Sequence, residues 1–272
     1  MILIFGSNGM LGSYIFSYLK DKFDIKVINR DYFDVFSLFK ENNLVKHLEK
    51  LLKDIKPDYI INCIGNILKV DDDLNKKYII NSYFPVILSM ICKKYDIILI
   101  HPTTDCVYSG DGPVYGDNSI PEPVDDYGLS KFLGENIDAC VIRTSIIGEE
   151  IYNNRSLINW VKNNNNNCIN GYTNHYWNGI TCLEYAKIVE EIIKNKSHWK
   201  GIKIITSNYK NNNFITKYEL VKIIINIYDL NIIVTPFKTE KKCDRRLKGY
   251  ICDTDLHDQL IELKIYNLKN KL

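Results

Sequence analysis

The residues with the clearest chemical potential are Tyr127 and Lys131, in the segment Tyr-Gly-Leu-Ser-Lys. If this segment is helical, the four-residue spacing puts the phenol and the ammonium on one face. There the cation is expected to lower the pKa of the phenol from roughly 10. The pair would then donate a proton at neutral pH, although two such residues can also form an ordinary surface pair.

A second candidate site follows the apolar opening of the chain, in the segment Gly-Ser-Asn-Gly-Met-Leu-Gly. Its three glycines recur at three-residue intervals after a predicted strand and at the start of a predicted helix. Such glycines let the backbone approach a pyrophosphate, to which the free amides of the helix N-terminus donate. A chance glycine turn is the alternative. The expected cofactor contacts are Gly6, Asn8, Gly9, Met10, Leu11 and Gly12.

The end of the next apolar run bears on the identity of the dinucleotide. An NAD site normally has a carboxylate there, which holds the ribose 2′-hydroxyl. Here Asn29 is followed by Arg30, and a guanidinium can pair with a 2′-phosphate. The sequence therefore favours NADPH, with NADH, or a plain surface charge at Arg30, as the alternatives. Cys63 and Gly65, after the third apolar run, complete the expected cofactor contacts.

Short apolar runs and longer stretches of helical periodicity alternate through the first half of the chain. The predicted strands are Ile2–Phe5, Ile25–Asn29, Tyr59–Ile64, Ile97–His101 and Cys140–Thr144. The predicted helices are 10–21, 43–55, 77–95 and 127–137. This alternation predicts an α/β protein with a Rossmann-like, doubly wound parallel sheet. We expect an NADP-binding domain over residues 1–150 and a smaller mixed α/β substrate-binding region over residues 151–272, whose chain can cross back.

The pattern is less regular elsewhere. Residues 102–126 are rich in Gly, Pro and Asp and predict a long loop over the mouth of the sheet. The Asn-rich run 163–167 predicts a solvated loop after a helix-like segment. Further elements are predicted as a helix near 181–195, a strand near 202–206, a helix near 215–228 and a last strand near 231–235.

Composition excludes several classes of function. The 35 Lys and Arg residues nearly balance 33 Asp and Glu, which argues against nucleic acid as the main partner. There is no apolar run long enough to span a membrane and no basic leader with a cleavage site, so we expect a cytoplasmic protein without a membrane partner. The eight cysteines have no metal-ligand spacing and predict free thiols and no metal site.

Thr104, Asp105 and Cys106 follow the fourth predicted strand, at the edge where doubly wound sheets bind ligands. They lie in the segment HPTTDCVYSGDGPVYG. Together with GSNGMLG, NCIGN and YGLSK, this segment resembles the extended short-chain dehydrogenase/reductases, and most closely the dTDP-4-dehydrorhamnose reductase branch. The resemblance covers residues 1–150 well and includes the bifunctional epimerase-reductases of UDP-rhamnose type.

This resemblance implies a reaction and a role for each residue. The reaction is NADPH-dependent reduction of the C4 ketone of a nucleotide-linked 4-keto-6-deoxyhexose. Tyr127 would protonate the forming alkoxide and Thr104 would bind the same oxygen, while Lys131 would hold the ribose and tune Tyr127. The nucleotide, UDP, dTDP or GDP, is left open.

Cys106 departs from the pattern of the plain reductases, which usually carry Tyr there, and matches the combined epimerase-reductases. A thiol beside the sugar could exchange a proton next to the ketone, especially if a neighbouring cation lowers its pKa. His175 is the candidate partner, which implies 3- or 3,5-epimerisation. A buried structural Cys106 and a hydrogen-bonded His175 are the alternative.

The remaining expected substrate contacts come from an aromatic segment and a basic cluster. With Thr104 and Asp105, they are Asn174, Trp177, Asn178 and Arg245. Two other functions stay open: a dehydratase or 4-epimerase of the same superfamily, and a non-catalytic NADP-binding regulatory subunit, since this fold also serves as an accessory subunit of methionine adenosyltransferase. We expect a nucleotide-sugar substrate and allow for a homodimer.

Overall fold

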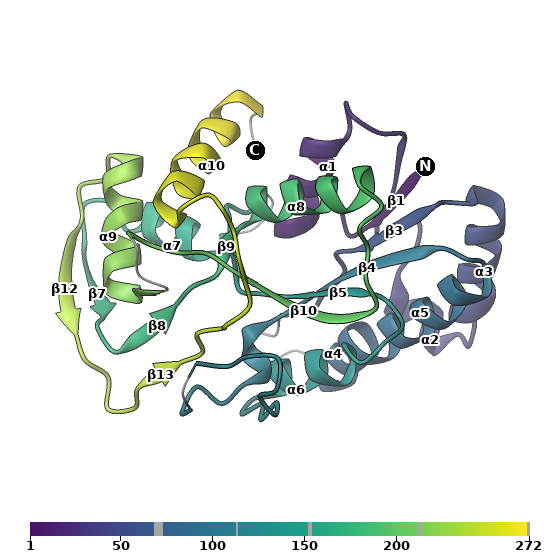
Figure 1. Cartoon of the computed structure of the whole chain (residues 1–272), viewed down its shortest axis with the longest axis horizontal. Coiled ribbons are helices and arrows are strands. Elements are labelled where there is room, and N and C mark those ends of the chain that lie inside the picture. The colour runs from purple at the N-terminus through teal and green to yellow at the C-terminus, as the bar shows by residue number, and fades with distance from the viewer. Residues whose placement is uncertain (68–72, 113, 152–153, 211–213, 271–272) are drawn as a thin grey trace.

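The computed structural model describes residues 1–67, 73–112, 114–151, 154–210 and 214–270. Its centre is a seven-stranded sheet whose neighbouring strands are all parallel (Figure 1). In spatial order the strands are β14 (Tyr250–Ile251), β10 (Gly201–Thr206), β5 (Cys140–Arg143), β4 (Ile98–Thr103), β3 (Tyr59–Asn62), β1 (Ile2–Phe5) and β2 (Ile25–Ile28). The strand order reverses between β1 and β3, which is where doubly wound sheets bind their ligands. The predicted α/β fold class is confirmed.

Helices cover both faces of this sheet because its strands are apolar on both sides. In β1, Ile2 and Ile4 pack into one core and Leu3 and Phe5 into the other. The first face is covered by α1 (Met10–Leu19), α8 (Cys182–Lys194) and α10 (Leu256–Asn270), and the second by α2 (Val35–Lys40), α3 (Leu44–Ile55), α4 (Leu74–Tyr78), α5 (Phe84–Lys94) and α6 (Asp126–Leu133) (Figure 1).

A smaller lobe lies at one end of the sheet, on the left in Figure 1. Two helices and two small sheets form it, and a two-stranded ladder connects it to the main body. Its elements are β6 (Ile146–Ile147), α7 (Leu157–Asn163), β7 (Cys168–Tyr172), β8 (His175–Trp177), β9 (Ile180–Thr181), β11 (Ile215–Thr216), α9 (Lys217–Tyr228), β12 (Ile233–Phe237) and β13 (Cys243–Asp244). Strand β8 pairs with both β11 and β13. The chain after residue 150 builds this lobe and also returns to the main sheet as β10 and β14.

Two predicted elements need correction. The helix predicted over 77–95 is interrupted by a π-helical turn at Ile79–Tyr83. Pro85 explains the interruption, because it has no N–H to donate to the carbonyl of Asn81, four residues earlier. The strand near 231–235 is not the last one, since β13, β14 and α10 follow it. In α10 the buried positions Leu256, Leu260 and Leu263 recur at helical spacing.

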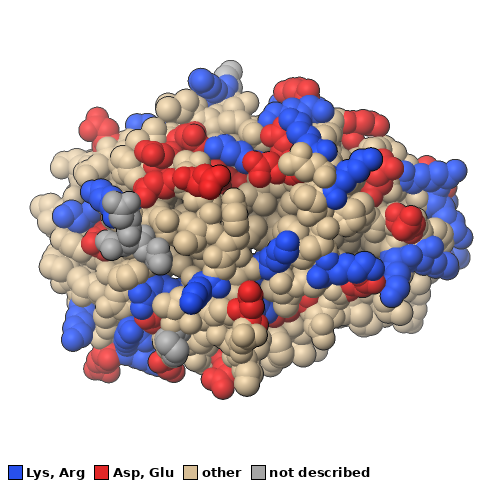
Figure 2. Space-filling model, viewed as in Figure 1, with Lys and Arg blue, Asp and Glu red and all other residues tan. Residues whose placement is uncertain are grey.

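The surface carries charges of both signs. On the face shown in Figure 2, Lys and Arg side chains are interspersed with Asp and Glu. No helix in the described ranges is both long and apolar enough to cross a membrane.

Candidate active site

The turn between β1 and α1 lies directly against the end of β3. Gly6 has φ +78, and a Cβ atom there would lie 2.9 Å from the carbonyl carbon and oxygen of Cys63. A Cβ on Gly12 would lie only 2.2 Å from the carbonyl oxygen of Gly6. Neither position can take a side chain without moving backbone, so the glycines hold this turn closed against the sheet.

The N-terminus of α1 opens from this turn and fits the diphosphate of a dinucleotide. Gly9 is the N-cap and has no side chain to occupy the first amides of the helix. These amides and the helix dipole suit an anion. Leu11 is 7% exposed and packs into the core, so it can offer only its backbone N–H. Asn8 is exposed in the turn itself.

Asn29 and Arg30 follow β2, beside the same turn. The Ser7 hydroxyl donates to Asn29 Oδ1 at 3.0 Å, which connects the first turn to the end of β2. Arg30 is exposed and its Nε lies 3.4 Å from Asp34 Oδ2. The guanidinium therefore stands at the edge of the cofactor site, loosely paired and free to turn toward a second anion.

Thr104 begins a short 3-10 turn, Asp105–Val107, directly after β4. Its hydroxyl accepts from the N–H of Cys106 at 3.2 Å and donates to Asp105 at 3.1 Å. Helix α6 packs tightly on this turn, because a Cβ on Gly128 would lie 2.1 Å from the carbonyl oxygen of Cys106. This close approach brings Tyr127 to Thr104 and Cys106, both of which influence its pKa.

The relation between Tyr127 and Lys131 differs from the expectation. Burial raises the pKa of Tyr127, and Cys106 and Asp105 raise it further. Lys131 instead turns its ammonium to the carbonyl oxygen of Pro102, to which it donates at 2.8 Å. The prediction of a cation-lowered phenol pKa is therefore wrong here. A raised pKa still keeps the phenol protonated at neutral pH, as a proton donor requires.

Lys131 is buried, and it lies between the strand that leads to Thr104 and the end of β3. Burial lowers its pKa to about 8, against the opposing effects of Glu135 and Cys63. Its field reaches Cys63, whose backbone adjoins Gly6. Lys131 thus joins α6 to β4 through Pro102, and its charge acts on Cys63 at the end of β3.

The π-helical turn Ile79–Tyr83 packs against α6 and binds it through side-chain hydrogen bonds. This contact was not predicted from the sequence. Asn81 Nδ2 donates to Ser130 Oγ at 3.0 Å, and Ser82 Oγ donates to the carbonyl oxygen of Ser130 at 2.7 Å. A Cβ on Gly134 would lie 2.0 Å from the carbonyl oxygen of Asn81. A proline inside a helical pattern, Pro85, was the sequence feature that could have predicted this π-helical turn.

Cys106 lies beside a cation, but the pKa of its thiol is raised. Arg245 Nη1 donates to its sulfur at 3.3 Å. Burial nevertheless raises the pKa of the thiol to about 12, with a further contribution from Asp105. The condition that would favour proton exchange, a thiol pKa lowered by a neighbouring cation, is therefore not met in this arrangement, because desolvation outweighs the guanidinium.

His175 is not joined to Cys106 by a hydrogen bond in the described part of the chain. Its Nε2 contacts the Thr239 hydroxyl at 2.9 Å, and its ring lies 4.7 Å from that of Tyr172. Burial lowers the pKa of His175, and the fields of Lys217 and Arg245 lower it further. His175 is therefore neutral at physiological pH.

Two of the expected substrate contacts have structural roles instead. Asn174 Nδ2 donates to the carbonyl oxygen of Thr239 at 2.8 Å, while its Oδ1 accepts from the Thr239 N–H at 3.1 Å. Asn178 makes the same double contact with Leu247, at 2.7 and 2.9 Å. Because both amides bind the chain's own backbone, we do not include them in the substrate site.

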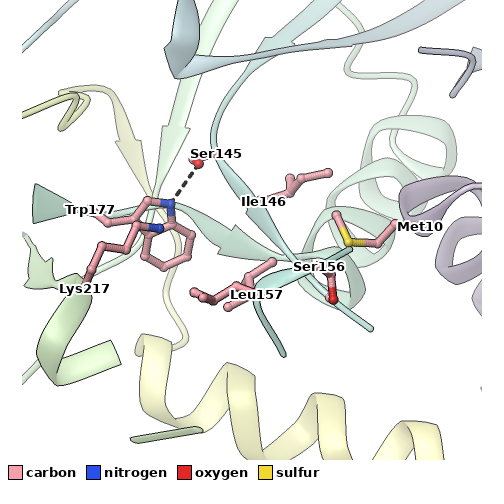
Figure 3. Close-up of a pocket in the computed structure, with 9 residues that line it drawn as sticks. Met10, Ser145, Ile146, Ser156, Leu157, Trp177 and Lys217 are labelled. Atoms are coloured by element: carbon pink, nitrogen blue, oxygen red, sulfur yellow. Dashed lines mark hydrogen bonds between the residues drawn. The ribbon is translucent and has the colours of Figure 1, made fainter. Parts of the chain in front are cut away.

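A cavity of about 130 Å³ lies between the glycine turn and the small lobe (Figure 3). Trp177 is 4% exposed and donates its indole N–H to Ser145 Oγ at 2.8 Å. Lys217 extends beside the Trp177 ring, and Met10 lies at the opposite end (Figure 3). The sequence did not single out Lys217, since its only signal was a place at the start of a predicted helix. The lining residues are Met10, Ser145, Ile146, Ile147, Gly148, Ser156, Leu157, Trp177 and Lys217.

Comparison with known proteins shows the family and the fold of the chain. The structure matches that of dTDP-4-dehydrorhamnose reductase from Bacillus anthracis, in complex with NADP, with a TM-score of 0.82 and 19% identity, over 97% of this chain and 98% of that one. Methionine adenosyltransferase 2 subunit beta from Xenopus laevis is 25% identical over 84% of this chain and 72% of its own length. The probable low-salt glycan biosynthesis reductase Agl14 from Haloferax volcanii is 27% identical, over 52% of each chain.

The predicted resemblance to the dTDP-4-dehydrorhamnose reductase branch is confirmed. The family model described as the RmlD substrate binding domain matches residues 1–245, most of the chain. The protein therefore belongs to the RmlD substrate-binding domain family, with the fold of the dTDP-4-dehydrorhamnose reductases.

Proposed function

We propose that this protein reduces the C4 ketone of a nucleoside-diphosphate 4-keto-6-deoxyhexose with NADPH. The observation that supports the proposal is that the Tyr127 phenol lies within reach of the Thr104 hydroxyl, with Lys131 on the same helix. Gly128 packs α6 onto the turn that contains Thr104, and Lys131 binds the carbonyl oxygen of Pro102 while its charge acts on Cys63. A hydroxyl, a phenol and a cation are the groups that carbonyl reduction needs.

Each side chain has a step in this reaction. NADPH supplies a hydride when it is bound. Thr104 donates its hydroxyl to the ketone oxygen and so fixes the carbonyl. As C4 is reduced, Tyr127 transfers its phenolic proton to that oxygen, which leaves an alcohol and a phenolate. Lys131 holds the ribose and supplies positive charge on the cofactor side of α6.

NADPH is proposed over NADH because Arg30 follows β2, next to Asn29, which contacts Ser7 of the glycine turn. Replacing Arg30 with Ala should weaken NADPH binding by about 3- to 10-fold, since an exposed charge-assisted contact is lost, and leave NADH binding unchanged. Titration of both cofactors measures this. Lys26→Ala, an exposed cation on β2, is the matched control. Equal effects of Arg30→Ala on both cofactors would make Arg30 an ordinary surface charge.

The experiment that tests the activity is NADPH oxidation, followed by absorbance, with UDP-, dTDP- and GDP-linked 4-keto-6-deoxy sugars. We expect turnover with one nucleotide series, and product analysis should show a C4 hydroxyl. Absence of turnover with all three would contradict the proposal.

A second candidate function is a regulatory subunit, favoured by the similarity to methionine adenosyltransferase 2 subunit beta. It predicts NADPH binding without oxidation by any of these sugars. It also predicts a stable complex with a methionine adenosyltransferase catalytic subunit, which size-exclusion chromatography would detect.

A further inference from the structure

Glu135 is a buried carboxyl to which the proposed reaction gives no part. It comes directly after Gly134, the residue that caps the C-terminus of α6, and is 1% exposed. The Thr103 hydroxyl donates to its Oε2 at 2.7 Å. Arg143 donates to both oxygens, from Nε to Oε2 at 3.3 Å and from Nη2 to Oε1. Hydrogen bonds and a counter-charge are what a buried carboxylate needs, so this environment suits the ionised form.

The register of the central sheet brings the partners of Glu135 together. Thr103, the last residue of β4, is paired with Arg143, the last residue of β5. Thr104 follows at once and begins the 3-10 turn, which Tyr108 ends. The Tyr108 hydroxyl accepts from Arg143 Nη1 at 2.7 Å, and its ring lies 5.3 Å from the guanidinium carbon. Glu135 and Arg143 therefore hold the chain on both sides of the turn that contains Thr104.

The charge of Glu135 also acts on Lys131, in the last turn of α6. It raises the pKa of Lys131 against the larger effect of burial. Burial raises the pKa of Glu135 itself, and the charges of Arg143 and Lys131 oppose that effect. One buried carboxylate thus lies between two buried cations.

Two further titratable groups face Lys131 from the sheet. Cys63, at the end of β3, has a thiol pKa that burial raises to about 12. His101, on β4, is buried, and burial and the charge of Lys131 hold its pKa well below its usual range. Both groups are uncharged at neutral pH, so neither supplies a counter-charge for Lys131.

The acidic groups on the elements that pack against α6 bind other residues. On the 3-10 turn, Asp105 accepts from the hydroxyl of the residue before it. Asp126, at the start of α6, accepts from the Tyr78 hydroxyl at 3.0 Å, and α4 itself contains no acidic residue. Among the described residues, the carboxylate whose charge acts on Lys131 is therefore that of Glu135.

We propose that Glu135 is a positioning residue for the reduction: it holds the turn that contains Thr104 in place and keeps Lys131 positively charged beside the cofactor. This deepens the proposed function and rests on it. Glu135 acts through Thr103 and Lys131 rather than on the substrate itself. A positive Lys131 is the form that holds the ribose and balances the phenolate left on Tyr127.

The test measures the charge of Lys131 directly. Lysine labelled with carbon-13 at Cε is incorporated into the whole chain, and the Lys131 signal is assigned by its loss in Lys131→Arg. Its chemical shift is followed from about pH 6 to about pH 10, where a buried lysine titrates. The variants are Glu135→Gln, Glu135→Asp and Arg143→Met, with Glu191→Gln as the matched control at an exposed position on α8.

A second variant guards against loss of the fold. Glu135→Gln leaves Arg143 buried without its counter-charge, which destabilises a protein. The double variant Glu135→Gln with Arg143→Met removes both buried charges and also lacks the charge of Glu135. Thermal melting would check that each variant is folded.

We expect the Lys131 titration to have its midpoint at about pH 8 in the wild type. The midpoint should be about one pH unit lower in Glu135→Gln and in the double variant, because the nearest negative charge is gone. Glu135→Asp should keep most of the wild-type value and Glu191→Gln all of it. Arg143→Met should not lower the midpoint, since the carboxylate then has Lys131 as its remaining cation.

Turnover should follow the charge of Lys131. Relative to the wild type, kcat/KM of Glu135→Gln should be about 5- to 10-fold lower between about pH 8 and about pH 9 than at about pH 6, where Lys131 is protonated in both proteins. Glu135→Asp should restore most of this loss.

Two results would overturn the proposal. One is an unchanged Lys131 midpoint in folded Glu135→Gln and in the double variant, and the other is an equal fall in Arg143→Met, which would assign the effect to lost packing. A fall of the midpoint in a protein that oxidises NADPH with none of the sugars would support the action of Glu135 on Lys131 and refute the reductase. The two failures are therefore distinguishable.

Discussion

The candidate active site has two walls that are built differently. The cofactor wall, formed by the carboxyl ends of β1, β3 and β4 with α6, is held by close backbone contacts such as those of Gly6, Gly12 and Gly128. The substrate wall is formed by β8, β13 and the start of α9. It is held by side-chain hydrogen bonds between residues far apart in the sequence. Asn174 and Asn178 contact Thr239 and Leu247, more than 60 residues away.

This difference separates the tasks of the two walls. Backbone contacts at van der Waals distance leave little freedom, which suits groups that must be aligned for proton and hydride transfer. Side-chain contacts can be exchanged without moving the sheet, which suits a surface that recognises one substrate among many. We therefore expect changes in the cofactor wall to act on turnover and changes in the substrate wall to act on binding.

Tyr127→Phe should give the largest effect. It removes the proton donor but keeps the ring, so kcat should fall about 10²–10⁴-fold while NADPH affinity stays nearly unchanged. His175→Ala, in the substrate wall, should lower kcat less than tenfold. Steady-state kinetics and cofactor titration measure both. A Tyr127→Phe enzyme with the wild-type kcat would remove Tyr127 from the mechanism.

The cofactor wall was also the more predictable one. Its residues come from short segments in which the glycine spacing and the Tyr-x-x-x-Lys pair determine the local backbone and side-chain placement. Strands β1 to β5 also agree with the predicted apolar runs. The π-helical turn beneath α6 was missed because helical periodicity continues through it. Only the missing N–H of Pro85 breaks the pattern.

The contacts of the substrate wall could not be predicted from the sequence in the same way. That Asn174 binds backbone rather than ligand depends on where Thr239 lies, and the place of Lys217 in the cavity wall depends on the position of Trp177. These positions follow from long-range pairing of short strands, which leave little trace in local periodicity. The pKa shift of Tyr127 was mispredicted for a related reason. Sequence spacing suggested the cation, but burial decided the sign.

Gly12→Ala tests whether backbone contact holds the cofactor wall. The added methyl would lie 2.2 Å from the carbonyl oxygen of Gly6, so we expect overpacking to cost about 1–3 kcal/mol of unfolding free energy. Gly9→Ala is the control within the same motif, since its nearest contact would be an ordinary 3.4 Å. Denaturant unfolding compares the two. Equal stabilities would mean that the turn can relax and that the wall is less rigid than described.

The pH dependence tests Lys131 within the same wall. Burial lowers its pKa to about 8, and the protonated form is the one that holds charge beside the cofactor. Activity should therefore be retained below about pH 8 and lost as the pH rises through that value, by about tenfold in kcat/KM per further unit. Lys131→Arg, if active, should extend the plateau to higher pH. A profile that stays flat to about pH 10 would contradict this role.

Cys106 lies where the two walls meet, and its substitution should have the smallest effect on reduction. Because burial and Asp105 raise the pKa of the thiol to about 12, it is not an anionic base at neutral pH. The wild type, incubated with substrate in deuterium oxide without reductant, should therefore incorporate little deuterium at C3 or C5. Cys106→Ser should lower kcat for reduction by no more than a few fold.

The opposite outcome would be equally informative. Rapid deuterium uptake that Cys106→Ser abolishes would mean that substrate binding strengthens the contact with Arg245 enough to stabilise a thiolate, and would establish an epimerase step. His175→Ala then identifies the partner acid: if it too abolishes exchange, the neutral His175 must move away from Thr239 when substrate binds. In that case the substrate wall would carry chemistry as well as recognition, and the division of tasks between the two walls would fail.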